Sequence, residues 1–195
     1  ANTYTGGTTL NGGVLQAGIS STGTITNGAF GTGSVTESNA GNVTIDLNGY
    51  TVKNALTLYS AASPSVYALT DSTGSGTASG NITLGTTNPT MIGLATSKSM
   101  TLSGILSGTN AALNINNGTD TGTVILTNTN TYSGVTTITS GTLALTGSGA
   151  IASSSSVAAN GTFDISGTTS GASIVTLSGS GTTTLGGKLL TITNG

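Results

Sequence analysis

The sequence predicts an all-β protein, a parallel β-solenoid of short stacked strands, and three observations lead to this prediction. Apolar residues recur in short alternating groups along most of the 195 residues. Segments rich in glycine separate these groups, and the chain holds 32 glycines but only two prolines. Charged residues make up 4% of the sequence, against about a quarter in a typical globular domain.

The alternating groups follow the pattern apolar, any residue, apolar. A period of two residues is that of a strand with one buried face. Each group supplies about two inward side chains, so we expect very short strands. The middle residue is often threonine, whose β-branched side chain suits a pleated surface. The groups lie at residues 43–47, 56–58, 82–84, 100–102, 113–115, 124–126, 143–145, 163–165, 175–177 and 190–192.

Short strands of this kind fit two architectures, and the repeats favour one of them. A sandwich or barrel uses strands of about five or six residues, often joined as hairpins. A parallel solenoid stacks shorter strands and shows recurring phrases. Rungs of about 20 residues would give roughly nine or ten rungs and a rod roughly 45 Å long. Sustained helical periodicity is missing, so we expect essentially no α-helix.

One phrase occurs twice in the chain. The phrase "NTYTGGTTLNGGVLQ" at residues 2–16 returns as "NTYSGVTTITSGTLAL" at 130–145, 128 positions later. When the last residues, "LLTITNG", are placed before the first, "ANTYTGG", the joined sequence is similar to the internal segment "VILTNTNTYSG" at residues 124–134. We therefore interpret residues 1–195 as a single continuous β-helical repeat segment of a longer tandem array, in which the phrase restarts near residues 1 and 129.

The composition excludes several functions. Three scattered lysines cannot neutralise a row of phosphates, so we expect no nucleic-acid partner. The absence of cysteine rules out disulfides and the common structural zinc site. No apolar run approaches the roughly 18–20 residues that would span a bilayer, so we expect no transmembrane segment in this chain. Since histidine is also absent, we expect stability to be nearly indifferent to salt and to pH between about 5 and 8.

The two long phrases resemble the autotransporter-associated β-strand repeat, also called the passenger-associated transport repeat, of bacterial surface proteins. Spacers at residues 31–49, 147–167 and 176–187 also look like those of this family, whereas residues 60–100 depart from its pattern. The resemblance implies a right-handed parallel β-helix in the exported part of a large surface protein. The family repeat brings no catalytic residue with it.

Two pairs of repeated side chains are the candidates for a site. Tyr4 and Tyr132 could stack on a glycan, but a role in a turn or in the core is the favoured interpretation. Asp46 and Asp164 could act as the acid and base of a glycosidase, yet we expect both to be repeat-equivalent residues that face solvent. No calcium-binding nonapeptide of the Gly-Gly-x-Gly-x-Asp type occurs. We therefore predict no catalytic, cofactor-binding or metal-binding residue, and we do not expect an enzyme.

These observations indicate a structural function, with one alternative from another class. The first interpretation is a stiff β-helical stalk or fibre, a repeat segment of an exported bacterial surface protein that stacks head to tail on further copies of itself. The alternative is an adhesin module that binds a surface carbohydrate through side loops such as residues 59–81. Both interpretations place the chain outside the cell or at the bacterial cell surface.

The alternation also predicts the direction of individual side chains. We expect Asp46, Asp164 and Thr191 to point outward. The side chains expected to point inward are Ile45, Leu47, Leu56, Leu58, Leu84, Leu102, Ile115, Leu126, Leu145, Ile165, Leu177 and Ile192.

Overall fold

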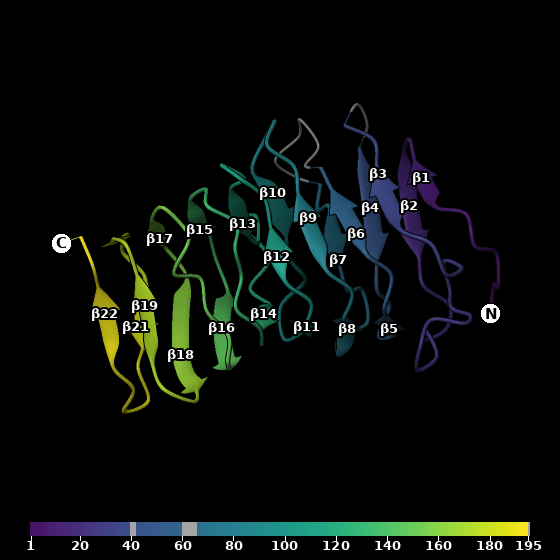
Figure 1. Cartoon of the computed structure of the whole chain (residues 1–195). Helices are drawn as coiled ribbons and strands as arrows, with labels where there is room; N and C mark the ends of the chain where they lie inside the picture. Colours follow the sequence, from purple (N-terminus) through teal and green to yellow (C-terminus); the bar gives the residue numbers. More distant parts are fainter. Residues whose placement is uncertain (40–41, 60–65, 195) are drawn as a thin grey trace.

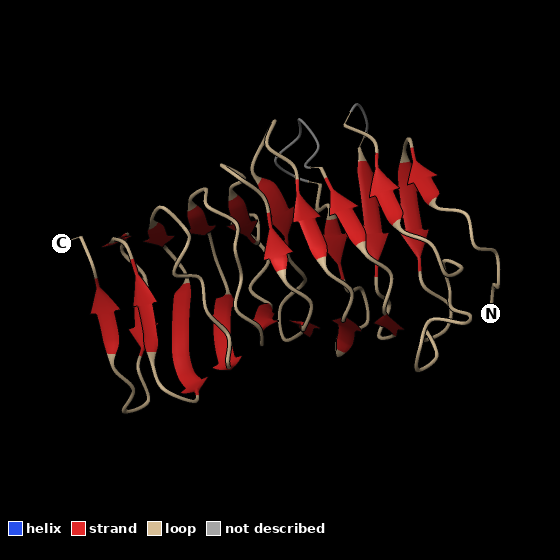
Figure 2. Ribbon diagram, in the orientation of Figure 1, coloured by secondary structure: helices blue, strands red, loops and turns tan. Residues whose placement is uncertain are grey.

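The computed structural model describes residues 1–39, 42–59 and 66–194, and these residues form a coil of short parallel strands (Figure 1). The two termini lie at opposite ends of the coil (Figure 1). Every pair of described strands is parallel, and the one antiparallel contact among the described residues is an isolated bridge between Asn2 and Gly28. No described residue is helical, which confirms the predicted all-β class (Figure 2).

Three long sheets and one short sheet make up the coil, and neighbouring strands in each sheet come from successive revolutions of the chain, here called rungs. The first sheet holds β1 (Thr8–Leu10), β3 (Val35–Glu37), β6 (Leu56–Leu58), β9 (Ile82–Leu84) and β12 (Leu106–Ser107). The second sheet holds β2 (Gly13–Gln16), β4 (Val43–Asp46), β7 (Leu69–Thr70), β10 (Thr90–Ile92), β13 (Leu113–Ile115), β15 (Thr136–Ile138), β17 (Val157–Ala159) and β20 (Leu177–Ser178). The third sheet holds β5 (Thr51–Val52), β8 (Gly76–Ala78), β11 (Ser99–Leu102), β14 (Thr123–Leu126), β16 (Thr142–Gly147), β18 (Thr162–Thr168) and β21 (Thr182–Thr184). The fourth sheet pairs β19 (Ala172–Ile174) with β22 (Leu190–Ile192).

The chain passes the sheets in the order first, second, third and back, but some rungs lack a strand on one face: β2 is followed directly by β3 of the first sheet, and β14 and β16 are each followed by a strand of the second sheet. β19 and β22 each follow a strand of the third sheet, so the fourth sheet takes the place of the first in the last rungs. The chain rises along the first sheet, nearest the viewer, and descends along the second as it proceeds from the N- to the C-terminus (Figure 2). This sense of rotation makes the coil right-handed, as the resemblance implied.

The rungs are longer in the N-terminal half than expected. Thr77 pairs with Thr101, 24 positions later, whereas Thr142 pairs with Thr162, 20 positions later. Longer rungs leave fewer of them: the longest sheet has eight strands, not the nine or ten predicted. The estimate of about 20 residues per rung was therefore right only for the C-terminal part.

Columns of stacked apolar side chains form the core. Leu126 lies between Leu102 and Leu145 in the third sheet, and all three are fully buried. In β6, β13 and β15 the outer two residues are buried and the middle one is partly exposed, as the alternation predicted. The inward side chains that the structure confirms are Ile45, Leu47, Leu56, Leu58, Leu84, Leu102, Ile115, Leu126, Leu145 and Ile165.

Two of the predicted core residues are not buried. Leu177 is only partly buried, and the exposed fraction of Ile192 is 44%. Both lie on the last strand of their sheet, β20 and β22, so no further rung of this chain covers them. The alternation of apolar residues along the strand gives the direction of these two side chains. A side chain that points inward is buried only where a neighbouring rung covers it.

Neutral amide side chains close the corners between sheets. Buried Asn116 accepts a hydrogen bond from the amide of Leu94 (3.0 Å) and donates to the carbonyl oxygens of Gly122 and Ser140 (3.0 Å each). One side chain thus satisfies backbone groups of adjacent rungs, where a buried polar group without a partner would be costly. This explains how the coil is held together with so few charges.

Candidate functional site

The two repeat-equivalent tyrosines make the same local hydrogen bond. The hydroxyl oxygens of Tyr132 and Thr136 lie 2.8 Å apart, and those of Tyr4 and Thr8 also lie 2.8 Å apart. Tyr132 is buried, and burial raises the pKa of its hydroxyl above the usual range. Tyr4, in contrast, is 45% exposed. The favoured interpretation, a role in a turn or in the core, holds for Tyr132. Its buried ring has no exposed face on which a glycan could stack.

The two copies of the phrase lie on different faces of the coil. The Thr-Thr-Leu segment at residues 8–10 is β1 of the first sheet, whereas Thr-Thr-Ile at 136–138 is β15 of the second. From β1 to β15 the chain makes five rungs and advances one further face. The spacing of 128 residues is therefore not a whole number of rungs, and the second copy starts one face further on than the first.

The burial of Tyr132 predicts a difference between two matched variants. Tyr132→Phe should lower the free energy of unfolding by about 1–2 kcal/mol, because the buried Thr136 hydroxyl loses a partner. Tyr4→Phe removes the same hydrogen bond at an exposed position and should cost less than about 0.5 kcal/mol. Urea denaturation of both variants measures the difference, and equal losses would contradict the assignment.

Asp46 does not face solvent, so this expectation was wrong. It is 3% exposed and accepts hydrogen bonds from the side-chain amide of Gln16 (2.7 Å) and the backbone amides of Asn48 and Ser72 (2.9 Å each). Burial opposes ionisation of this carboxyl, but the hydrogen bonds from Gln16, Ser72 and Asn48 outweigh it and lower the pKa. The anionic carboxylate of Asp46 accepts these hydrogen bonds and thereby stabilises the turn after β4.

Asp164 is not the structural equivalent of Asp46. It lies on β18 of the third sheet and is partly buried, whereas Asp46 ends β4 of the second sheet. Its carboxylate accepts a hydrogen bond from the backbone amide of Ser166 (2.8 Å). The structure does not bring the two carboxyls together, so they cannot act as the acid and base of one reaction. The similar phrases around them fold onto different faces.

Glu37 is a buried acid that the sequence analysis missed. Its side chain is fully buried beside Leu10 of β1, in the inward column of the first sheet. One carboxyl oxygen accepts a hydrogen bond from the Tyr59 amide (2.8 Å), and the other has no partner among the described residues. Burial raises the pKa of Glu37 to about 8, although the Tyr59 hydrogen bond acts in the opposite direction. The pattern Val35-Thr36-Glu37 already placed the glutamate on the inward face.

The pKa of Glu37 corrects the expected indifference to pH. Folding keeps this carboxyl protonated at pH values where the unfolded chain ionises it, so stability must fall as pH rises between about 4.5 and 8. The expected indifference to salt is unaffected and stays a prediction.

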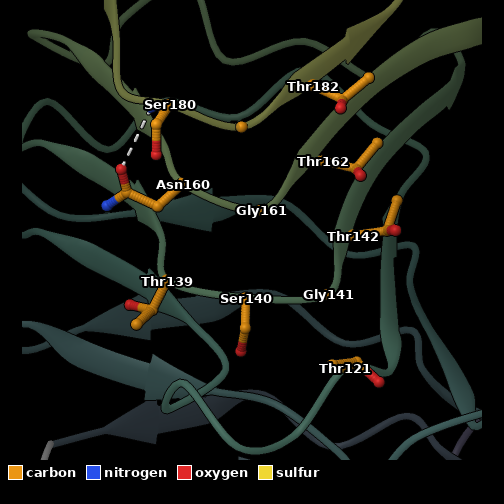
Figure 3. A pocket seen from close by; sticks show the side chains of 11 residues that line it. Thr121, Thr139, Ser140, Gly141, Thr142, Asn160, Gly161, Thr162, Ser180 and Thr182 are labelled. Carbon is orange, nitrogen blue, oxygen red and sulfur yellow. Dashed lines mark hydrogen bonds between the residues drawn. The ribbon is translucent and has the colours of Figure 1, made fainter.

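A polar groove of about 570 Å³ crosses the corner between the second and third sheets in the C-terminal half (Figure 3). Three successive rungs contribute the same kind of segment to it, Ser140-Gly141-Thr142, Asn160-Gly161-Thr162 and Ser180-Gly181-Thr182. Thr142, Thr162 and Thr182 stand one above another on one side of the groove (Figure 3).

Glycine is required at the floor of this groove. A Cβ atom on Gly181 would collide with the carbonyl oxygen of Gly161, and one on Gly161 would lie 2.6 Å from the carbonyl oxygen of Gly141. The lining offers hydroxyl groups and one side-chain amide but no ionisable group and no aromatic ring. The groove can hydrogen-bond a neutral polar ligand, and its lining contains no ionisable side chain that could activate the Ser and Thr hydroxyls as nucleophiles.

The loop predicted at residues 59–81 is not one loop. Residues 60–65 lie outside the described residues, and the remainder contains the two short strands β7 and β8. In the part of the chain that the structure describes, no three His, Cys, Asp or Glu side chains are grouped so that they could hold a metal ion. No described helix is long and apolar enough to cross a membrane.

Comparison with known protein families finds a match that includes both copies of the repeated phrase. The family model of the passenger-associated-transport-repeat matches residues 1–17 and 119–145, which contain both copies of the phrase. The three spacers that also look like the family lie wholly outside this match. No curated protein and no solved structure matches the chain. The chain is therefore one that carries the passenger-associated-transport repeat, folded as a right-handed parallel β-helix.

Proposed function

We propose that this chain is a stiff structural segment of an exported bacterial surface protein, a β-helical stalk extended by head-to-tail stacking of further units. The observation that carries the proposal is the set of unbroken parallel sheets along the coil, the longest with eight strands. Each inner rung is hydrogen-bonded through its backbone to the rung before and the rung after. Bending the rod would stretch these bonds and open the packed core.

The nature of the repeat supports a location outside the cell. The matched repeat takes its name from the passenger, the exported part of an autotransporter, and the fold fits a structural repeat of such a passenger. A chain with 4% charged residues and buried apolar columns also suits such a role, because stacked like charges would repel along the rod. We therefore place the chain on the bacterial surface or in the extracellular medium.

Small-angle X-ray scattering of the dilute chain tests the stalk. We expect an elongated monomer with a constant cross-section, together with resistance to proteases along the inner rungs, because their backbone is held in continuous ladders. A compact or flexible particle, or rapid cleavage between β8 and β16, would overturn the proposal.

The polar groove favours a second candidate, an adhesin for a neutral surface carbohydrate. Hydroxyl and amide groups repeated on successive rungs can hydrogen-bond successive units of a glycan chain, although no aromatic ring is present to stack on a sugar. A glycan array tests this function. If a glycan binds, Asn160→Ala should weaken binding at least about tenfold, whereas Thr57→Ala on the first sheet should not. An array without any bound glycan would reject the adhesin.

A further inference from the structure

The floor of the polar groove is a column of glycines that runs parallel to the axis of the coil (Figure 3). The threonine at the start of β16, β18 and β21 each donates its backbone amide to the carbonyl oxygen of the glycine one rung earlier (2.8–3.1 Å). Four successive rungs thus have glycine at the same position: Gly122, Gly141, Gly161 and Gly181. Because glycine has no side chain, the groove can continue from one rung to the next.

A lysine closes the N-terminal end of this groove. Lys98 occupies the position of the glycines one rung before Gly122, since the amide of Thr123 donates to its carbonyl oxygen (2.9 Å). The side chain of Lys98 lies against Gly74, and its Nζ donates to the carbonyl oxygen of Thr73 (3.0 Å). It therefore fills the space that glycine leaves open in the later rungs. The groove has a defined beginning within the chain.

One side of the groove continues a column of hydroxyl groups. Thr123, Thr142 and Thr162 are paired on successive rungs, point outward and are partly exposed. Their hydroxyl groups make no hydrogen bond to any other described residue. Each rung thus presents one hydroxyl group, in the same orientation on the sheet, to a ligand in the groove.

The other side of the groove carries Asn160 and Ser180, with Gly161 between Asn160 and Thr162 (Figure 3). The side-chain oxygen of Asn160 accepts the backbone amide of Ser180 (3.5 Å). The side-chain nitrogen of Asn160 has no partner among the described residues and is a second donor for a ligand. Both sides of the groove therefore offer neutral hydrogen-bonding groups.

We propose that this groove binds a neutral, linear, β-1→4-linked glycan that lies parallel to the coil axis with one sugar unit on each rung. The inference rests on the adhesin function proposed above, and it specifies the class and the direction of the ligand.

The repeat distance of the coil favours such a chain. Successive rungs are about 4.8 Å apart. A ligand that makes the same hydrogen bonds on each rung must repeat at nearly this distance, and a β-1→4-linked pyranose chain is extended with units close to one rung in length. An extended peptide repeats every two residues, or about 6.7 Å, so its groups would fall out of step with the rungs.

The charges around the groove favour a neutral glycan. The lining contains no ionisable group. Asp164 lies two residues beyond Thr162 on the same outward face of β18 and is partly exposed. Its carboxylate would repel an anionic sugar held beside Thr162, and no cationic side chain of the lining offsets this repulsion.

The length of the ligand provides the first test. Residues of four successive rungs line the groove, from Thr121 to Thr182. Calorimetric titration with cello-oligosaccharides of two to six units should therefore show affinity that rises about threefold to tenfold for each unit up to four, as expected for one or two neutral hydrogen bonds per unit. Longer oligosaccharides should bind with little further gain.

Malto-oligosaccharides of equal length are the matched control for shape. Their α-1→4 linkage curves the chain, so that only one or two units can follow a straight groove. We expect the four-unit malto-oligosaccharide to bind at least about tenfold more weakly than the four-unit cello-oligosaccharide.

Thr162→Val tests the hydroxyl column, because valine keeps the shape of threonine and removes only the hydroxyl group. The variant should bind the four-unit cello-oligosaccharide about threefold to tenfold more weakly than the original chain. Thr57→Val is the matched control, an outward and partly exposed position on β6 of the first sheet. It should leave the affinity unchanged, and thermal unfolding should show that both variants are folded.

Each contrary result overturns a defined part of the proposal. Equal affinity for all lengths, or for cello- and malto-oligosaccharides, would overturn the axial arrangement and leave the adhesin in place. A glycan array with ligands of another class only, such as anionic glycans, would overturn the neutral β-1→4-linked chain. An array without any ligand would reject the adhesin and this inference together, whereas the stalk depends on none of these results.

Discussion

Leu126→Ala should lower the free energy of unfolding by about 2–5 kcal/mol. Leu126 is fully buried between Leu102 and Leu145, so its truncation removes contacts with the rungs on both sides. Backbone ladders hold the rung spacing, and the neighbouring side chains cannot move in to fill the space. Chemical denaturation measures the loss.

Ile125→Ala is the matched control on the same strand. Ile125 points outward and is only partly buried, so its truncation should cost less than about 1 kcal/mol. A loss below about 0.5 kcal/mol for Leu126→Ala, or equal losses for the two variants, would mean that the inward and outward faces of β14 are assigned wrongly.

Raising the pH from 4.5 to 8 should destabilise the protein through Glu37. Below pH 4.5 both the folded and the unfolded chain carry this proton, so the full stability is present. Between about 4.5 and 8 the unfolded chain releases the proton while the folded chain retains it, and stability falls with each unit. The total loss is on the order of 2–5 kcal/mol, at about 1.4 kcal/mol per unit of pKa shift. Above about pH 8 no further change is expected from this group.

Two variants of Glu37 test whether this residue causes the fall in the free energy of unfolding as pH rises. Glu37→Gln keeps the shape of the side chain, and Glu37→Leu removes the polar group altogether; neither can ionise. Both should give a nearly flat free energy of unfolding between pH 5 and 8, whatever their absolute stability. Persistence of the wild-type slope in both variants would show that Glu37 is not its source.

The pH prediction shows where composition was an insufficient guide. The lack of histidine indicated that no group titrates between pH 5 and 8, but burial raises the pKa of the Glu37 carboxyl into this range. Glu37 follows the inward Val35 by two positions, so its direction could be inferred from the alternation. The degree of burial, which shifts the pKa, depends on the packing of β1 and the Tyr59 segment against it.

The fold class, the direction of most core side chains and the repeat could all be predicted from the order of the amino acids alone. A period of two residues can bury only one face of a strand, and a chain with few charges and with glycine at its turns can stack that face rung on rung. The phrase beginning at Asn2 and Asn130 was specific enough to identify the repeat, as the family match confirms.

How the rungs close and which face each segment occupies could not be predicted in this way, because both depend on packing in three dimensions. A rung may take 20 or 24 residues, because the corners accept loops of different lengths while the strands keep their pairing. The same phrase therefore falls on different faces in its two copies, and Asp46 and Asp164 are separated although their phrases are alike. Burial at Tyr4 and Ile192 likewise depends on whether another rung lies beyond them, since a side chain in a column is covered by its neighbours in space and not by its neighbours in sequence.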